Sequence, residues 1–404
     1  MLNFIKSKKD CTGCGACLNA CPVDGITMHA DQEGFLYPEK NENCIDCEQC
    51  ENACPLASGD THWNHKFVQH AFAAVSKDKK VWQASTSGGA FTEICKAFGD
   101  DNTVIFGAVF DGLHVRHFHV FGCGQIEPFR KSKYVQSDIG LCYRDVRALL
   151  EENKTVIFSG APCQIAGLRK YLVHDYDNLL CVDFICHGVG SPAVFQAFLL
   201  YLEAKYGAKI NSYTFRAKNV FLGNFSSYVS RYIFENGKTI FVENDEYNNF
   251  FLQQLCLRPS CGENCRFRTN ERLGDLTIAD FKQREIIFPL ISDYRNYSTI
   301  IVNSKKGEEV LGRLYKNMNI LSCDLDHVKK YNPLFYTTTK GNPLREAFFN
   351  DFTNGMNFKD LVQVYNTLPA KIKRADQIKK MIPYNIKYWI RRISTKLKGN
   401  RQNS

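Results

Sequence analysis

The stretch CTGCGACLNACP at residues 11–22 recurs as CIDCEQCENACP at residues 44–55, with every cysteine and the final proline in the same place. Both stretches follow the pattern Cys-x2-Cys-x2-Cys-x3-Cys-Pro, so this part of the chain is an internal duplication. An iron–sulfur cubane needs four thiolates; in this pattern three come from one tight loop and the fourth from the opposite run. The spacing therefore predicts two [4Fe–4S] clusters, one held by Cys11, Cys14, Cys17 and Cys54, the other by Cys44, Cys47, Cys50 and Cys21.

Zinc is the alternative interpretation of spaced cysteines, but zinc usually takes paired Cys-x2-Cys motifs on separate knuckles instead of two such runs. Gly13 and Gly15 allow the backbone to fold tightly around the sulfurs. Across residues 9–56 the chain resembles two-cluster bacterial ferredoxins, with all eight ligands present. We therefore expect a ferredoxin domain over residues 1–60, with residues 58–66 serving as a linker.

The ten other cysteines of the eighteen are scattered along the chain. Met1–Asp10 is lysine-rich and is not followed by an apolar run, so we expect no cleaved export signal. No apolar stretch is long enough for a membrane-spanning helix. Without export, spaced cysteines indicate metal or redox chemistry more than disulfides. We therefore expect a cytoplasmic protein.

The formal net charge of +9 is concentrated in the tail, because residues 371–404 contain eleven Lys or Arg and a single acid, Asp376. The body is nearly neutral, which argues against a nucleic-acid partner. Within residues 382–397, Ile, Leu and Trp389 recur at helical spacing between basic residues. This pattern predicts a basic amphipathic helix, which either binds an anionic membrane surface at the inner face of the membrane or packs on the body or a partner.

The remainder of the 404 residues is expected to form an α/β body, since 44% of the chain is hydrophobic and strands alternate with helices. A small-residue loop, Ser85–Gly89, opens a helix at residues 90–98. A strand at 154–158 leads into a glycine loop and a helix, and a strand at 179–185 ends at Cys186. Functional loops lie at the C-terminal ends of parallel strands, and both Cys163 and Cys186 fall there. Residues 211–242 alternate as antiparallel hairpins do.

Three further cysteines follow in the pattern Cys256-x4-Cys261-x3-Cys265. Three thiols within ten residues favour a cluster site, although the spacing differs from that of the first region. Buried structural thiols are the alternative. The overall fold class expected is therefore α+β and multidomain, a 2[4Fe–4S] ferredoxin-like domain followed by an α/β body that binds Fe–S and, as the resemblance described next implies, flavin.

Six ordered motifs resemble one family, the beta subunits of coenzyme F420 (8-hydroxy-5-deazaflavin) hydrogenases and dehydrogenases, to which 7-hydroxymethyl chlorophyll a reductases are similar. They are STSGG (85–89), KSKYVQS (131–137), SGAPCQIAGL (159–168), DFICHGVGSP (183–192), RPSCGENCRF (258–267) and RLGDLTIADF (272–281). The resemblance implies an N-terminal family domain over residues 66–150 and a C-terminal one over 151–345, and the basic amphipathic tail expected over 346–404 lies outside it. One departure is Ala279–Lys282, where relatives often have Gly-Asp-Phe-Trp.

The resemblance implies FAD and a third [4Fe–4S] cluster. Its cysteine ligands would be Cys163, Cys261, Cys265 and a fourth residue, for which Cys186 is favoured over Cys256. The flavin site carried over by motif comprises Ser87, Gly88, Gly89, Lys133, Tyr134, Gln136 and Ser137. Lys133 would supply positive charge near the isoalloxazine or the phosphates, and His187 is the expected proton donor because histidine titrates in the right range. A solvated lysine and a backbone-bonded histidine are the alternatives.

These observations predict an iron–sulfur flavoprotein oxidoreductase that passes electrons from the ferredoxin clusters through a body cluster to FAD. The acceptor would be a deazaflavin coenzyme or a small organic molecule, such as a polysaccharide precursor, and an external ferredoxin would act as a redox partner. The alternative is a non-catalytic electron-transfer subunit that docks on a hydrogenase or dehydrogenase.

Overall fold

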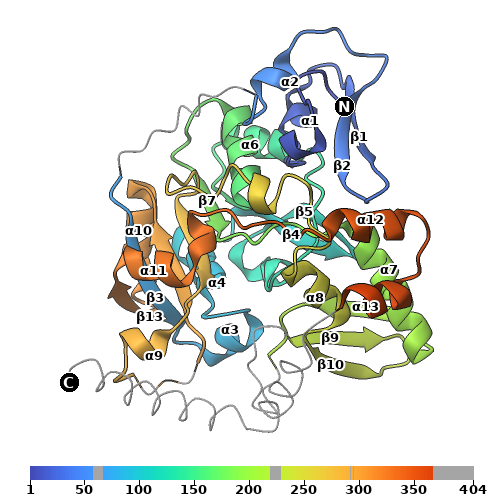
Figure 1. The fold of residues 1–404 in the computed structure, drawn as a ribbon. Helices are drawn as coiled ribbons and strands as arrows, with labels where there is room; N and C mark the ends of the chain where they lie inside the picture. Colours follow the sequence, from blue (N-terminus) through green and yellow to red (C-terminus); the bar gives the residue numbers. More distant parts are fainter. Residues whose placement is uncertain (58–66, 219–228, 292, 294, 367–404) are drawn as a thin grey trace, which may run out of the picture.

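The computed structural model describes residues 1–57, 67–218, 229–291, 293 and 295–366. A small N-terminal unit, coloured blue, lies against a larger body built on a mixed sheet (Figure 1). The arrangement confirms the expected fold class, a ferredoxin-type domain followed by a larger α/β body.

In the N-terminal unit each cysteine loop is followed by a short helix, α1 (Ala16–Ala20) or α2 (Gln49–Asn52). Between them β1 (Ile26–Ala30) and β2 (Leu36–Lys40) form an antiparallel hairpin. The first loop needs glycine, because Gly13 and Gly15 have φ of 67° and 76°, in the left-handed region that other residues rarely adopt.

The body is organised around an eight-stranded sheet with the strand order β13-β3-β12-β11-β7-β6-β4-β5. Its four adjacent parallel strands are β4 (Val104–Asp111), β6 (Val156–Ser159), β7 (Leu179–Phe184) and β11 (Leu276–Asp280). The antiparallel strands flanking them are β5 (His114–Phe121), β12 (Ser298–Val302), β3 (His70–Ser76) and β13 (Met318–Cys323). The predicted parallel layer is confirmed, so β6 and β7 end at the same edge of the sheet.

Helices cover both faces of this sheet because its central strands are apolar on both faces. Val156, Ile157 and Phe158 of β6 are all fully buried. Ile157 shares a core with α4 (Ala90–Phe98) and α10 (Lys305–Leu314) on one face. The two neighbours of Ile157 pack with α5 (Cys142–Glu151) and α6 (Pro162–Leu172) on the other. The remaining helices near the antiparallel side are α3 (Lys79–Ala84), α9 (Arg284–Ile287) and α11 (Leu325–Tyr331).

A second, three-stranded antiparallel sheet follows the order β10-β9-β8, as expected for residues 211–242. Its strands are β8 (Ile210–Thr214), β9 (Val229–Phe234) and β10 (Thr239–Glu243). The helices sharing its aromatic core are α7 (Pro192–Tyr206), α8 (Glu246–Leu252), α12 (Arg345–Thr353) and α13 (Phe358–Tyr365). The last two helices pack on the body through pairs such as Phe198–Phe358 and Phe250–Phe348. The expected boundary at residue 346 thus leaves out two helices that belong to this core.

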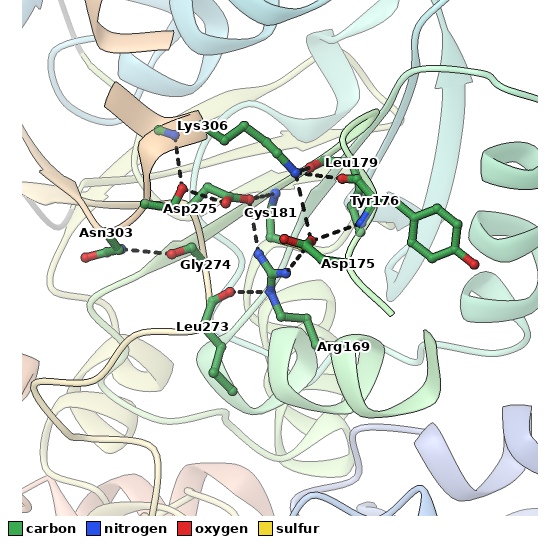
Figure 2. A network of polar contacts seen from close by, with 12 residues as sticks. Arg169, Asp175, Tyr176, Leu179, Cys181, Leu273, Gly274, Asp275, Asn303 and Lys306 are labelled. Atoms are coloured by element: carbon green, nitrogen blue, oxygen red, sulfur yellow. Dashed lines mark hydrogen bonds and ion pairs between the residues drawn. The ribbon is translucent and has the colours of Figure 1, made fainter. Parts of the chain in front are cut away.

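A buried polar network fastens the C-terminal half of α6, whose N-terminal turn carries Cys163 (Figure 2). The Arg169 guanidinium contacts Asp275 Oδ2 at 3.2 Å and Asp175 Oδ1 at 3.0 Å, and it donates to the carbonyl oxygen of Leu273. Asp275 also accepts a hydrogen bond from the backbone N–H of Cys181. The network therefore ties α6 to β7 and to the start of β11.

Among the described residues, no helix has the length and apolar character needed to cross a bilayer. The basic amphipathic helix predicted at residues 382–397 and the linker predicted at 58–66 lie outside the part of the chain that the structure describes.

Candidate iron–sulfur centres and flavin site

Four cysteines of the N-terminal unit surround one cavity, which we call the proximal hollow. Its cysteine lining is the set predicted for the first cluster, Cys11, Cys14, Cys17 and Cys54. Burial raises the pKa of the Cys14 thiol to about 12, and the neighbouring Cys54 and Cys11 add to that shift. Burial and the same neighbours raise the pKa of Cys17. Thiols with raised pKa values, such as those of Cys14 and Cys17, are stabilised as thiolates by a cationic metal core.

The other predicted set, which we call the distal set, contains Cys21, Cys44, Cys47 and Cys50. Burial raises the pKa of Cys50, with smaller contributions from nearby Cys21 and Cys44. Cys47 is exposed at the surface. Gly25 permits this packing, because a Cβ there would lie 2.9 Å from the Cα of Cys44. The distal set therefore lies nearer to solvent than the proximal one.

A second cavity, the body hollow, is lined by the four cysteines expected for a third cluster, Cys163, Cys186, Cys261 and Cys265. Burial raises the pKa of Cys186 to about 12, and Cys261 and Cys265 contribute to the rise. Cys256 is fully buried in the aromatic core and is not among the described residues that line this hollow. The geometry therefore favours Cys186 over Cys256 as the fourth sulfur.

Adjacent parallel strands bring these sulfurs together. Cys163 opens α6 directly after β6, and Cys186 follows β7, its neighbour in the sheet. Cys261 and Cys265 flank a single 3₁₀ turn, Gly262–Asn264. Gly188 has a φ of 132°, and a Cβ there would lie 3.2 Å from that of Cys261, so glycine allows the Cys186 loop to approach.

The sulfurs surround cavities instead of converging on one point. Among the described residues, no group of three or more His, Cys, Asp or Glu side chains is arranged to hold a single metal ion. The two hollows have empty volumes of about 380 and 470 Å³, space open to solvent included. Each hollow is lined by four cysteines, and this number of sulfur ligands fits a multi-iron cubane, in which each sulfur binds a different iron atom.

The proximal hollow and the body hollow are neighbours. Thr12, between Cys11 and Gly13 in sequence, lines the body hollow. On α6, a Cβ at Gly167 would lie 3.0 Å from the Cys14 Sγ. The thiol of Cys163 is also close enough for Cys14 to contribute to its raised pKa, after the larger effects of burial, Cys186 and Cys261. The two cysteine sets are thus separated by little more than one stretch of backbone.

Three arginines that the sequence analysis did not select lie at these hollows. Arg268 and Arg272 line the body hollow, and the Nε of each is buried without a hydrogen-bond partner. Arg272 also stacks on Phe335 at 4.5 Å and lies 4.0 Å from the buried Asp183. The third, Arg258, donates to the backbone of the proximal set. Arg258 and Arg272 lie inside two of the family motifs, which could have indicated them, and Arg268 directly follows the first of these motifs.

The loop expected to bind flavin is tightly held against the sheet. Ser87 Oγ donates to the Tyr297 carbonyl at 2.6 Å, and the Gly88 N–H donates to Ser298 Oγ at 2.9 Å. A Cβ on Gly88 would lie 2.3 Å from the carbonyl oxygen of Ala74, so only glycine fits. Gly89, with a φ of 93°, precedes the first residue of α4.

Cations gather beside this loop. Burial lowers the pKa of Lys133 to about 7, and Lys131 adds to the shift. Lys218, absent from the expected set, donates to the Ser87 carbonyl at 2.7 Å, and burial and Arg216 lower its pKa to about 6. The Ser132 N–H donates to Thr86 Oγ1, which joins the two predicted loops. The Lys133 ammonium itself donates to the carbonyl of Pro128, whereas the Lys218 ammonium at this loop and the start of α4 beside it suit an anionic ligand such as a pyrophosphate.

The other residues of the predicted flavin site contact groups outside the Ser85–Gly89 loop. Tyr134 stacks on Phe251 with ring centroids 4.6 Å apart. Gln136 contacts Thr12 of the N-terminal unit, and Ser137 bonds to His117. Some residues of the predicted flavin site, such as Ser87 and Gly88, therefore lie in the loop before α4, whereas Gln136 lies at the contact with the ferredoxin domain. The role of each residue at a flavin stays a prediction.

His187 follows Cys186 and lies beside the body hollow. Its Nε2 is 3.2 Å from the carbonyl oxygen of Phe251, so this nitrogen carries the ring hydrogen and donates it. Burial, together with Arg268, lowers the pKa of His187 to about 4. His187 is thus bonded to the backbone, which the sequence analysis gave as the alternative to a catalytic role. Its role as a proton donor stays a prediction.

Comparison with known proteins gives these sites a family context. Residues 10–58 match the 4Fe–4S dicluster domain, and residues 153–327 match the C terminus of the coenzyme F420 hydrogenase/dehydrogenase beta subunit. No curated protein matches the chain. A solved chain of the F420-reducing [NiFe] hydrogenase complex from Methanosarcina barkeri is 14% identical, with 71% of this chain and 94% of that chain covered and a TM-score of 0.42. The chain is therefore similar to a 4Fe–4S dicluster domain at its N-terminus and, over residues 153–327, to the C terminus of the coenzyme F420 hydrogenase/dehydrogenase beta subunit, as its cysteine runs and motifs predicted.

Proposed function

We propose that this iron–sulfur protein is a flavin-dependent oxidoreductase that moves electrons from its N-terminal clusters through a body [4Fe–4S] cluster to FAD. The observation that carries the proposal is the contact between the proximal hollow and the body hollow. Thr12 lines both of them. Bound clusters supply single-electron transfer, and a bound flavin converts it into two-electron chemistry.

The chain's own residues suit the two ends of this path. Cys47 is exposed, so the distal set is accessible to an external redox partner of the ferredoxin type. At the other end, the N-terminus of α4 after Gly89 and the nearby Lys218 provide N–H groups and positive charge for the phosphates of FAD. The final acceptor would be a deazaflavin coenzyme or a small organic molecule, polysaccharide precursors included. An anionic membrane surface is the further partner proposed for the basic tail.

Anaerobic purification with iron, sulfide and flavin quantified per chain tests this proposal. We expect about twelve irons and one FAD. Cys163→Ser should remove about four irons and leave the ferredoxin clusters, because Cys163 lines only the body hollow. Cys95→Ser is the matched control, since Cys95 is a fully buried thiol in a separate core. Wild-type protein with about eight irons and no flavin would overturn the proposal.

A non-catalytic electron-transfer subunit is the second candidate, favoured by the match to a family described as a beta subunit. The isolated chain, given dithionite-reduced ferredoxin and candidate acceptors, separates the two. Turnover without any partner subunit supports an independent reductase, whereas flavin reduction without turnover of any acceptor until a partner is added supports the subunit.

A further inference from the structure

Arg258 joins the body to the first cluster loop of the ferredoxin domain. Its side chain is 1% exposed and belongs to the body segment that also carries Cys261. Nε donates to the Cys11 carbonyl at 2.8 Å, and Nη2 lies 3.5 Å from Cys11 Sγ and donates to the Leu36 carbonyl at 2.9 Å. Nη1 donates to Gln136 Oε1 at 2.8 Å. The Cys11 sulfur here stands for the thiolate that would bind iron.

Every oxygen that Arg258 contacts is neutral. Within the described part of the chain, no carboxylate oxygen lies within 4.0 Å of its guanidinium nitrogens. Its faces are covered by aromatic rings, with Tyr37 at 4.2 Å and Phe35 at 5.5 Å. A buried charge without a counterion is costly. Of the groups that its guanidinium contacts, the one that becomes anionic is the Cys11 thiol, a ligand predicted for the proximal cluster.

The first cluster loop is shaped around this side chain. A Cβ on Gly13 would lie 2.9 Å from Arg258 Nη1 and 2.3 Å from Gln136 Nε2. The same arginine reaches the body hollow through its backbone, because its carbonyl accepts the N–H of Cys261 at 2.9 Å. Arg258 therefore touches one cysteine from each of the two adjacent sets.

We propose that Arg258 is a positioning residue that compensates the charge of the proximal cluster and raises its reduction potential, holding that cluster beside the body hollow. A cubane bound by four thiolates is a net anion that gains one more negative charge on reduction, so a fixed cation and an N–H directed at a ligand sulfur both favour the reduced form. The importance of Arg258 for onward electron transfer rests on the proposed function. Its effect on the reduction potential of the proximal cluster depends only on the dicluster domain.

The test is an EPR-monitored redox titration of the purified full-length protein, with dithionite as reductant. Arg258→Gln should lower the equilibrium constant for one-electron reduction of one ferredoxin-domain cluster at least tenfold, which corresponds to a shift of about 59 mV to lower potential. The other ferredoxin-domain cluster should keep its potential. Arg266→Gln is the matched control, because Arg266 also contacts the ferredoxin domain but is 60% exposed and paired with Asp10.

A variant with full iron content and wild-type potentials overturns the proposal, as does an equal shift in Arg266→Gln. If Arg258→Gln does not retain its clusters, Arg258→Lys decides. The lysine keeps the charge and loses the forked contacts. A shift of the cluster's reduction potential to a lower value, by less than about 59 mV, therefore supports the proposal. An unchanged or raised potential overturns it. Absence of a body cluster or flavin from the wild type would contradict the proposed function and leave this measurement valid.

Discussion

The Tyr143 hydroxyl on α5 lies 2.7 Å from the carbonyl oxygen of Cys14 and 2.8 Å from that of Gln164. One carbonyl belongs to a ligand loop of the proximal hollow, and the other belongs to the residue after Cys163 at the start of α6. Tyr143 is fully buried, so a single hydroxyl group supports the backbone at both cysteine sets. A contact of this kind fixes how far apart the two sets lie.

Tyr143→Phe should therefore destabilise the fold by about 1–3 kcal/mol, because it leaves two buried carbonyl oxygens without this donor. Chemical denaturation followed by circular dichroism measures the loss. Tyr315→Phe provides the control, since that ring is 50% exposed and its change should fall within about 0.5 kcal/mol. Equal stability of Tyr143→Phe and wild type would contradict the assigned role.

Cys186→Ser should lower the iron content by about four atoms per chain, whereas Cys256→Ser should leave it unchanged. The first sulfur lines the body hollow, and the second is enclosed in the aromatic core. Iron and sulfide analysis of both variants, purified anaerobically, decides between them. Loss of iron from Cys256→Ser alone would reverse the assignment of the fourth ligand.

Asp275→Asn should destabilise the protein by about 3–5 kcal/mol, because it leaves the buried Arg169 without its buried counterion. Asp175→Asn is a matched change at the same guanidinium, but Asp175 is 44% exposed, so its loss should cost about 0–1 kcal/mol. Urea titrations of the two variants give the difference directly. Similar costs at both positions would show that burial does not govern this network.

His117 should make stability depend on pH between its ordinary pKa of 6.5 and its folded value of about 4, which burial depresses. In that window the unfolded chain binds a proton on this ring and the folded chain does not. Stability should therefore be lost as the pH falls, by up to about 3 kcal/mol near pH 4. His117→Gln should reduce the slope of stability against pH, and the exposed His174→Gln should leave it unchanged. An unaltered slope in His117→Gln would refute this.

Several elements could be predicted because their signals are local. The helix expected at residues 90–98 matches α4, since the glycine pair marks its start, and the strand expected at 179–185 matches β7. The burial of His117 on β5, at 3% exposure, depends on tertiary packing that no local pattern indicated. Its hydrogen bonds to Ser137 and the Ser159 carbonyl satisfy both ring nitrogens inside the core.

The sequence by itself predicted the eight N-terminal ligands and the family resemblance, because cluster chemistry requires a fixed local spacing of thiolates and the motifs occur in order along the chain. Only the tertiary structure placed Cys186, and not Cys256, at the body hollow, because that placement depends on β6 and β7 being neighbours in the sheet. It also decided the partner of Arg258, whose guanidinium meets a cysteine 247 residues away. A long side chain can point in many directions from one position in the sequence, and only packing selects the group that it meets.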